Sequence, residues 1–161
     1  MFKRLLVPLD GSRFASRALP YAVEVAKRFS AEVILLQVVK PATAVIDAAT
    51  PIGVSAAGSE IAVQVALEAN RRNCGCARRY LSGKVRAIRS RHIQSSYRVL
   101  TGDIAHSIIE FSEKEDIDLV VMTTHGKSGL KRAVMGSIAD VVIRESGKPV
   151  LVIRPQASSK K

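Results

Sequence analysis

The sequence contains no tryptophan, and aromatic residues make up only 4% of its 161 residues. Because hydrophobic residues still account for 47% of the chain, valine, isoleucine, leucine and alanine must build the core. That composition is typical of a buried parallel sheet covered by helices. The length suits one domain, so we expect a single domain over residues 1–155 and a disordered tail over 156–161.

Cysteine is equally scarce, with Cys74 and Cys76 the only two in the chain. Two thiols separated by one residue fit poorly with a structural disulfide, and no second pair completes a zinc site. We therefore expect reduced thiols on a helix and no bound structural metal.

A long apolar run is missing from the N-terminal segment. The run that ends at Pro8 is too short for a signal peptide or a membrane span. The sequence thus predicts a cytoplasmic protein without a membrane partner.

Acidic residues are few compared with basic ones, 14 against 25, which gives a net charge of +11. Eight of the basic residues lie between Arg71 and Arg91. Such a stripe is either a solvated helix face or a nucleic-acid footprint. No zinc finger or stretch of interleaved aromatic and basic residues supports the second interpretation, so we expect no nucleic-acid partner.

Apolar runs alternate with segments of helical periodicity along the chain. The runs predict strands at 5–7, 33–39, 97–100, 119–122 and 150–153. Helices are predicted at 15–29, 59–90, 105–112 and 137–145. This alternation predicts an α/β fold with a five-stranded, parallel, doubly wound sheet.

The sequence also predicts local features of the helices. Ser12 and Asp103 are expected to cap the first and third helices, and Gly75 and Gly83 to kink or split the second. The spacing predicts the positions at which the second helix faces the core: Ile61, Val65, Ala69, Ala77, Leu81, Val85 and Ile88.

Two irregular loops follow the strands that we expect to lie centrally. In such sheets, ligands bind outside the carboxyl ends of the strands. The loop after the fourth strand contains Gly126 and Gly129, and Gly136-Ser137 opens the next helix. A helix start suits phosphate, with the Gly136 amide and the Ser137 hydroxyl as further donors. These residues are equally compatible with ordinary turns, and neither a GxxxxGK[ST] nor a GxGxxG motif is present.

The chain resembles the universal stress proteins. LLVPLDGSRFASRALPYAVEVAKRF and AEVILLQVV are similar to the N-terminal half of that family. YRVLTGD, DLVVM and the run VVMTTHGKSGLKRAVMGSIADVVIRESGKPVLVIRP are similar to its C-terminal half. The resemblance implies a three-layer sandwich of the adenine nucleotide alpha-hydrolase-like type.

The ATP-binding members carry G-x2-G-x9-G-[ST] in this loop, and here Thr123 stands in place of the first glycine. The resemblance assigns the triphosphate and ribose to Gly126, Gly129, Gly136, Ser137 and the amide of Ile138. It assigns adenine contacts to Pro8, Asp10, Val38 and Met122. A Thr123 side chain would either crowd the ribose or phosphates, or add a hydrogen bond.

The resemblance further implies a homodimer paired through the last strand, 149–153. Because the loop suits phosphate but the chain shows no complete set of catalytic groups, we expect a stress-response regulator that binds ATP, with Mg²⁺ or Mn²⁺ as an optional ion, and hydrolyses little of it. Two alternatives stay open. One is a slow ATPase or nucleotidyl-transfer enzyme that uses Asp10, a metal ion and His125. The other is a nucleic-acid-binding module that uses the 71–91 stripe.

Overall fold

The computed structural model describes residues 1–42, 56–124 and 136–154, with the side chains of 56–60 excepted. The elements are β1 (Arg4–Pro8), the 3-10 helix η1 (Ala15–Ala18), α1 (Leu19–Phe29), β2 (Glu32–Val39), α3 (Ala56–Arg89), β3 (Ser95–Thr101), α4 (Ile104–Lys114), β4 (Leu119–Thr123), α5 (Ser137–Glu145) and β5 (Val150–Ile153). The predicted tail, 156–161, and most of the loop between β2 and α3 lie outside the described residues.

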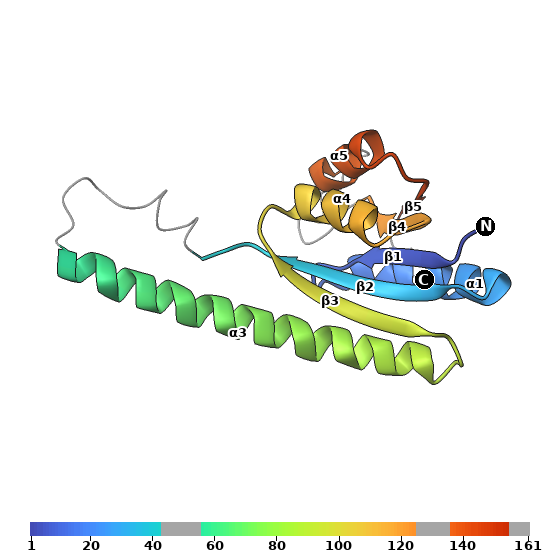
Figure 1. Cartoon of the computed structure of the whole chain (residues 1–161). Helices are drawn as coiled ribbons and strands as arrows, with labels where there is room; N and C mark the ends of the chain where they lie inside the picture. Colours follow the sequence, from blue (N-terminus) through green and yellow to red (C-terminus); the bar gives the residue numbers. More distant parts are fainter. Residues whose placement is uncertain (43–55, 125–135, 155–161) are drawn as a thin grey trace, which may run out of the picture.

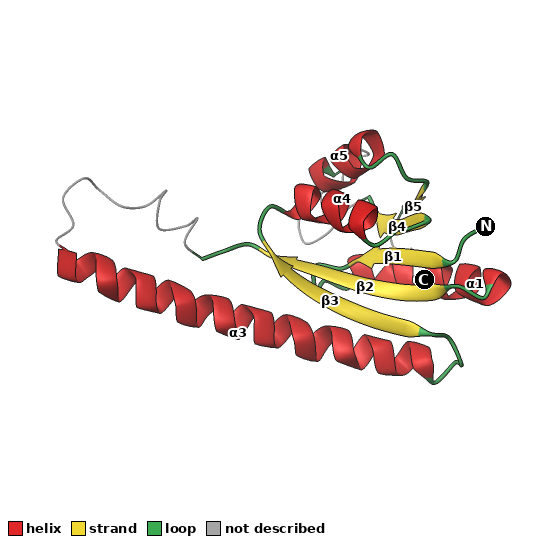
Figure 2. Ribbon diagram, in the orientation of Figure 1, coloured by secondary structure: helices red, strands yellow, loops and turns green. Residues whose placement is uncertain are grey.

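The five strands form one parallel sheet in the order β3-β2-β1-β4-β5, which confirms the predicted fold class. Helices α1 and α3 cover one face, and α4 and α5 cover the other (Figures 1 and 2). Alternate residues of each strand therefore enter different cores, as Leu5 and Val7 do on the α1 side and Leu6 on the α5 side. Burial on both faces is why the strands read as continuous apolar runs.

Asp103 caps α4 as predicted, because its carboxylate accepts from the His106 amide at 2.9 Å. The Ser12 hydroxyl accepts from the Ala15 amide at 3.0 Å, but Ser12 lies in the turn before the helix, and Phe14 is the N-cap residue of η1. The first predicted helix begins as the 3-10 turn η1 before α1 continues it.

Helix α3 is continuous over 34 residues, so the predicted kink or break at Gly75 and Gly83 is wrong. A Cβ placed at either glycine would meet no atom within 4 Å, because both face open space. The helix is about 51 Å long at 1.5 Å per residue. The strands that it covers have 8 and 7 residues, about half that length.

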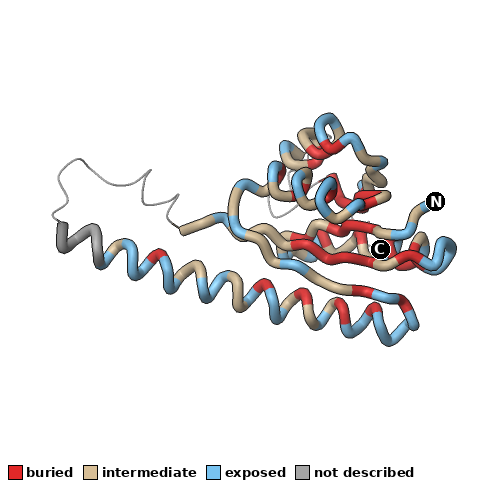
Figure 3. Tube along the Cα trace, viewed as in Figure 1, coloured by how far each residue is buried: buried red, intermediate tan, exposed pale blue. Residues whose placement is uncertain are grey.

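Because of this mismatch in length, only the C-terminal part of the predicted inward face of α3 is buried. Ala77, Leu81, Val85 and Ile88 are buried against the sheet, whereas Ile61 is 67% and Val65 is 62% exposed. The first turns of α3 project past the sheet, as Figures 1 and 3 show. Ala69, which the same pattern placed inward, is partly exposed.

Asp118 fastens the start of the chain to the sheet. Its carboxylate accepts from the amides of Lys3 at 2.7 Å and Arg4 at 2.9 Å. These amides, with weaker contributions from the N-terminal amine and Lys148, lower the pKa of Asp118 below its usual value.

We expect Asp118→Asn to lower the free energy of unfolding at pH 7 by about 1 kcal/mol, because a neutral acceptor replaces a charged one. A carboxyl whose pKa is lowered by folding stabilises the protein above its unfolded pKa and loses that effect as the pH falls through the folded pKa. The difference from wild type should therefore shrink below about pH 4. Urea unfolding of both proteins at pH 7 and pH 3 measures this difference in unfolding free energy. An equal difference at both pH values would contradict the lowered pKa of Asp118.

Candidate functional site

The strand order reverses between β1 and β4. From β1 the chain builds β2 and β3 on one side of the sheet, then crosses to build β4 and β5 on the other. The carboxyl ends of β1 and β4 are therefore neighbours at the switch point, where open α/β sheets form their ligand crevices. The central position predicted for these two strands is confirmed.

The turn after β1 is held by short-range hydrogen bonds. The Asp10 carboxylate accepts from the Ser12 amide at 2.9 Å, and the Leu9 amide donates to the Leu36 carbonyl at 2.8 Å. Gly11 lies between Asp10 and Ser12 with φ of +82°, a conformation that favours glycine. Asp10 thus has a structural role in this turn.

The start of α5 is fastened to the end of β4. The Gly136 amide donates to the Thr124 carbonyl at 2.8 Å, and the Thr124 amide donates to the Ile153 carbonyl at 3.2 Å. The Gly136 amide is therefore engaged, which corrects the expectation that it adds a free donor. The Gly136 carbonyl accepts from the Asp140 amide at 3.0 Å and opens the helix.

No side chain caps the N-terminus of α5 within the described residues. The amides of Ser137, Ile138 and Ala139 form the first turn, where an α-helix has no internal acceptors for its N–H groups. Together with the helix dipole, they present positive potential at the switch point. Asp140, the acidic residue of this turn, is paired with Arg144 (N–O 2.5 Å).

Several apolar residues lie on the same side of the sheet as α5. Met122 belongs to the core between the sheet and helices α4 and α5, and Val38 and Ile138 pack against that core. Pro8 follows Leu6 by two residues in β1, so it faces the same side. The structure thus brings together four of the residues predicted to contact the nucleotide.

Thr123 faces the other way. It follows Met122 in β4, so alternation turns its side chain toward the α1 side of the sheet, where it is 7% exposed. The residue that replaces the family's first glycine therefore points away from Met122 and the other apolar residues on the α5 side.

Gly126, Gly129 and His125 lie outside the described residues. In the described ranges, no three His, Cys, Asp or Glu side chains are grouped as metal ligands. Cys74 and Cys76 are free thiols on α3, as expected. Among these same ranges, no helix is both long enough and apolar enough to span a membrane.

Sequence reasoning missed Gln37, which interrupts the apolar run of β2 near its carboxyl end. Its Oε1 atom is buried and accepts no hydrogen bond from the described residues, and its Nε2 atom lies 3.8 Å from the position of a Cβ on Gly11. The polar residue in an otherwise apolar strand was the available signal. An unsatisfied buried acceptor is costly, which marks Gln37 as a further polar group near the switch point.

Comparison with known proteins identifies the chain. The model of the universal stress protein family matches residues 1–154. Universal stress protein MJ0531 of Methanocaldococcus jannaschii is 32% identical over 154 residues, which cover 96% of this chain and 83% of the relative. The chain belongs to the universal stress protein family.

Solved universal stress proteins share the fold. The structure of MJ0577 matches with a TM-score of 0.81 at 25% identity, covering 98% of this chain and 99% of that one. A universal stress protein in complex with cAMP matches with a TM-score of 0.58 at 21% identity, over 95% of this chain and 97% of that one. A family member from Arabidopsis thaliana with AMP bound matches with a TM-score of 0.61 at 16% identity, over 99% and 95%.

Proposed function

We propose that this universal stress protein binds an adenine nucleotide, ATP in the first instance, at the carboxyl ends of β1 and β4. The observation that carries the proposal is the N-terminus of α5, which no described side chain caps and which the Gly136–Thr124 hydrogen bond fastens to the switch point. Main-chain donors in this position favour phosphate. The cAMP and AMP complexes of proteins with this fold support an adenine nucleotide as the ligand.

The proposed site divides into an apolar and a polar part. Pro8, Val38 and Met122 would contact the adenine, with Asp10 accepting a hydrogen bond from the base or ribose. The amides of the first turn of α5, the Ser137 hydroxyl, Gly126 and Gly129 would hold the ribose and phosphates. A Mg²⁺ or Mn²⁺ ion bound to the phosphates would offset their repulsion from Asp10.

The proposed role is nucleotide-dependent regulation of a stress response with little turnover. Asp10, in the turn after β1, already accepts a hydrogen bond from the Ser12 amide, which supports a positioning role for it rather than that of a free base. Occupancy by ATP would then shift conformation or partner choice. Release of phosphate at many turnovers per hour by the purified protein, lost in Asp10→Ala, would contradict this role.

Nucleotide binding is tested directly on the purified protein. The protein is denatured, and any released nucleotide is identified by chromatography and mass spectrometry. If none is released, calorimetric titration with ATP, AMP and cAMP follows. Release of ATP on denaturation, or saturable binding of ATP in the titration, supports the proposal. No released nucleotide and no binding of any of the three would refute it.

We also propose that the protein dimerises through β5. This strand lies at the edge of the sheet, as predicted, and Val150, Leu151 and Val152 are only partly buried. An apolar edge promotes pairing unless something covers it. A second β5 would cover it across a two-fold axis.

We expect light scattering at micromolar concentration to give the mass of a dimer, and Val152→Lys to give that of a monomer. Ser90→Lys, which adds the same charge at the exposed end of α3, is the control and should remain dimeric. Wild-type protein that is wholly monomeric at this concentration would disprove the dimer.

A further inference from the structure

An open cavity of about 580 Å³ lies on the opposite edge of the molecule from β5. It is lined by Ser82, Val85, Arg86, Arg89, Ser96, Tyr97 and Arg98. The first four residues come from the last turns of α3, and the others from β3, the second edge strand of the sheet. The lining carries three guanidinium groups and no carboxylate. This cavity is separate from the switch point.

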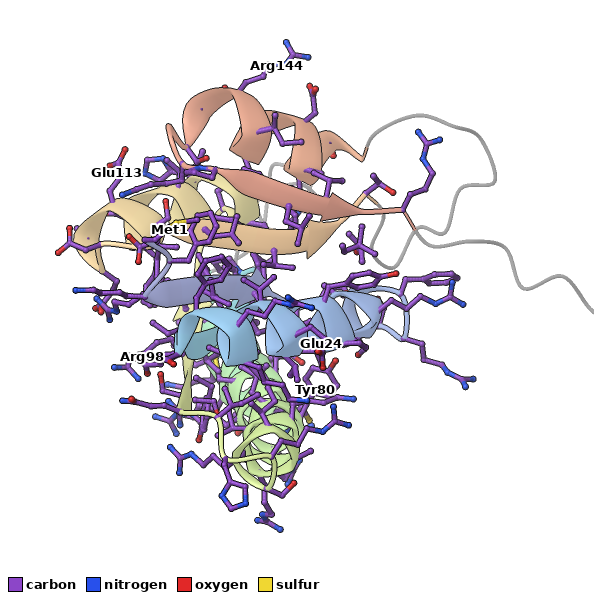
Figure 4. The ribbon with its side chains drawn as sticks, turned by 90° about the vertical axis from the view of Figure 1, so that its right-hand side faces the viewer. Met1, Glu24, Tyr80, Arg98, Glu113 and Arg144 are labelled. Atoms are coloured by element: carbon purple, nitrogen blue, oxygen red, sulfur yellow. The ribbon has the colours of Figure 1, made fainter. Side chains whose placement is uncertain are left out.

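Two of the three guanidinium groups are held in place by backbone carbonyls. The Gln94 carbonyl points toward β2, where it accepts from the Val33 amide, so the carbonyls of Ser95 and Tyr97 point outward. Arg89 donates to the Ser95 carbonyl through Nε at 3.0 Å and Nη2 at 2.7 Å. Arg98 donates to the Tyr97 carbonyl at 3.0 Å and points outward beside β3 and α3 (Figure 4).

These contacts orient the charges without neutralising them, because a carbonyl group has no net charge. The side chain of Arg86, one helical turn before Arg89, lines the same cavity and forms no hydrogen bond or ion pair with any described residue. The Ser82 and Ser96 hydroxyls also line the cavity, but they donate their protons to the Arg79 carbonyl at 2.9 Å and to Glu32 at 2.7 Å, so the arginines are its charged donors. Guanidinium forks held in fixed positions favour phosphate groups.

The shape and chemistry of the cavity exclude two larger occupants. The guanidinium groups of Arg89 and Arg98 cover the outward carbonyls, so an added β-strand would have to displace them. Tyr97 is the only aromatic residue of the lining, and it packs against the core instead of offering a free face for a nucleic-acid base. A compact anion that is recognised by its phosphates alone meets neither obstacle.

We infer that the cavity between β3 and the end of α3 binds a compact anion of several linked phosphates, such as inorganic tripolyphosphate. One carboxylate lies nearby, since the Ser96 hydroxyl donates to Glu32 at 2.7 Å. This carboxylate repels an anion in the cavity. The inference therefore predicts that removing arginine charges weakens anion binding, whereas removing the Glu32 charge strengthens it.

Calorimetric titration with sodium tripolyphosphate in 0.1 M NaCl tests the site. We expect saturable binding that Arg86→Gln/Arg98→Gln weakens at least about tenfold, because two charged donors are lost. Glu32→Gln should bind more tightly than wild type. Arg28→Gln, which removes the same charge from the end of α1, should change the affinity less than twofold.

Further arms separate this site from the proposed nucleotide site and from other ligands. Gly136→Val should leave tripolyphosphate binding intact if the cavity is the site. Loss of binding in Gly136→Val with no effect of the arginine changes would move the anion to the switch point and overturn the inference. The inference would also fail if wild type did not bind tripolyphosphate, or if Arg28→Gln weakened binding as much as the cavity variant. Tighter binding of a single-stranded oligonucleotide than of tripolyphosphate at the cavity would overturn it as well.

Discussion

Gly136→Val is expected to raise the dissociation constant for ATP by about tenfold to 100-fold. Gly136 has φ of −63° and ψ of 144°, a conformation open to any residue, so valine introduces no backbone strain. Its branched side chain would stand at the start of α5, between the first-turn amides and the phosphates. Loss of a hydrogen bond to a charged group costs about 1.5 to 3 kcal/mol, which corresponds to this change in affinity.

Calorimetric titration with ATP measures the effect, and Gly136→Ala, with one methyl group, should give a smaller loss. Gly83→Ala provides the matched glycine control, because its Cβ would lie in open space on α3. That control should leave ATP affinity unchanged. If Gly136→Val bound ATP as wild type does, the phosphates would have to lie elsewhere.

Leu81→Ala should lower the free energy of unfolding by about 3 kcal/mol, because it removes a large side chain from a close-packed core. Leu81 is 0% exposed and joins α3 to the core beneath β1 and β2. For a chain of this length, the midpoint of thermal unfolding should fall by about 10 °C.

Val65→Ala is the matched control on the same helix. Val65 is 62% exposed on the part of α3 that projects past the sheet, so its change should stay within about 0.5 kcal/mol. Thermal and urea unfolding of the two variants compare the sites. Equal losses would mean that the projecting part of α3 is buried in solution, which would contradict the described arrangement.

Much of the fold was predictable because its signals are local. The apolar runs 33–39 and 119–122 are buried on both faces, so burial itself produces the continuous pattern that identifies them. The side chains of Ser12 and Asp103 each bond to an amide three residues later, a spacing that a sequence displays directly. The same holds for the glycine spacing that links the loop after β4 to the universal stress proteins.

The errors arose where the outcome depends on distant segments. Ile61 and Val65 have the helical spacing of a buried face, but the face is buried only as far as the sheet extends. Gly75 and Gly83 weaken a helix in isolation, yet the packing of Leu81 and Val85 holds α3 continuous through them.

The sequence by itself determined the fold class and the family, because periodicity and glycine spacing are encoded over short stretches. Only the tertiary structure decided that the Gly136 amide bonds to Thr124, that Thr123 faces away from Met122, and that Arg89 and Arg98 meet at one sheet edge. These relations depend on strand order and register, which join segments far apart in the chain and leave no local pattern.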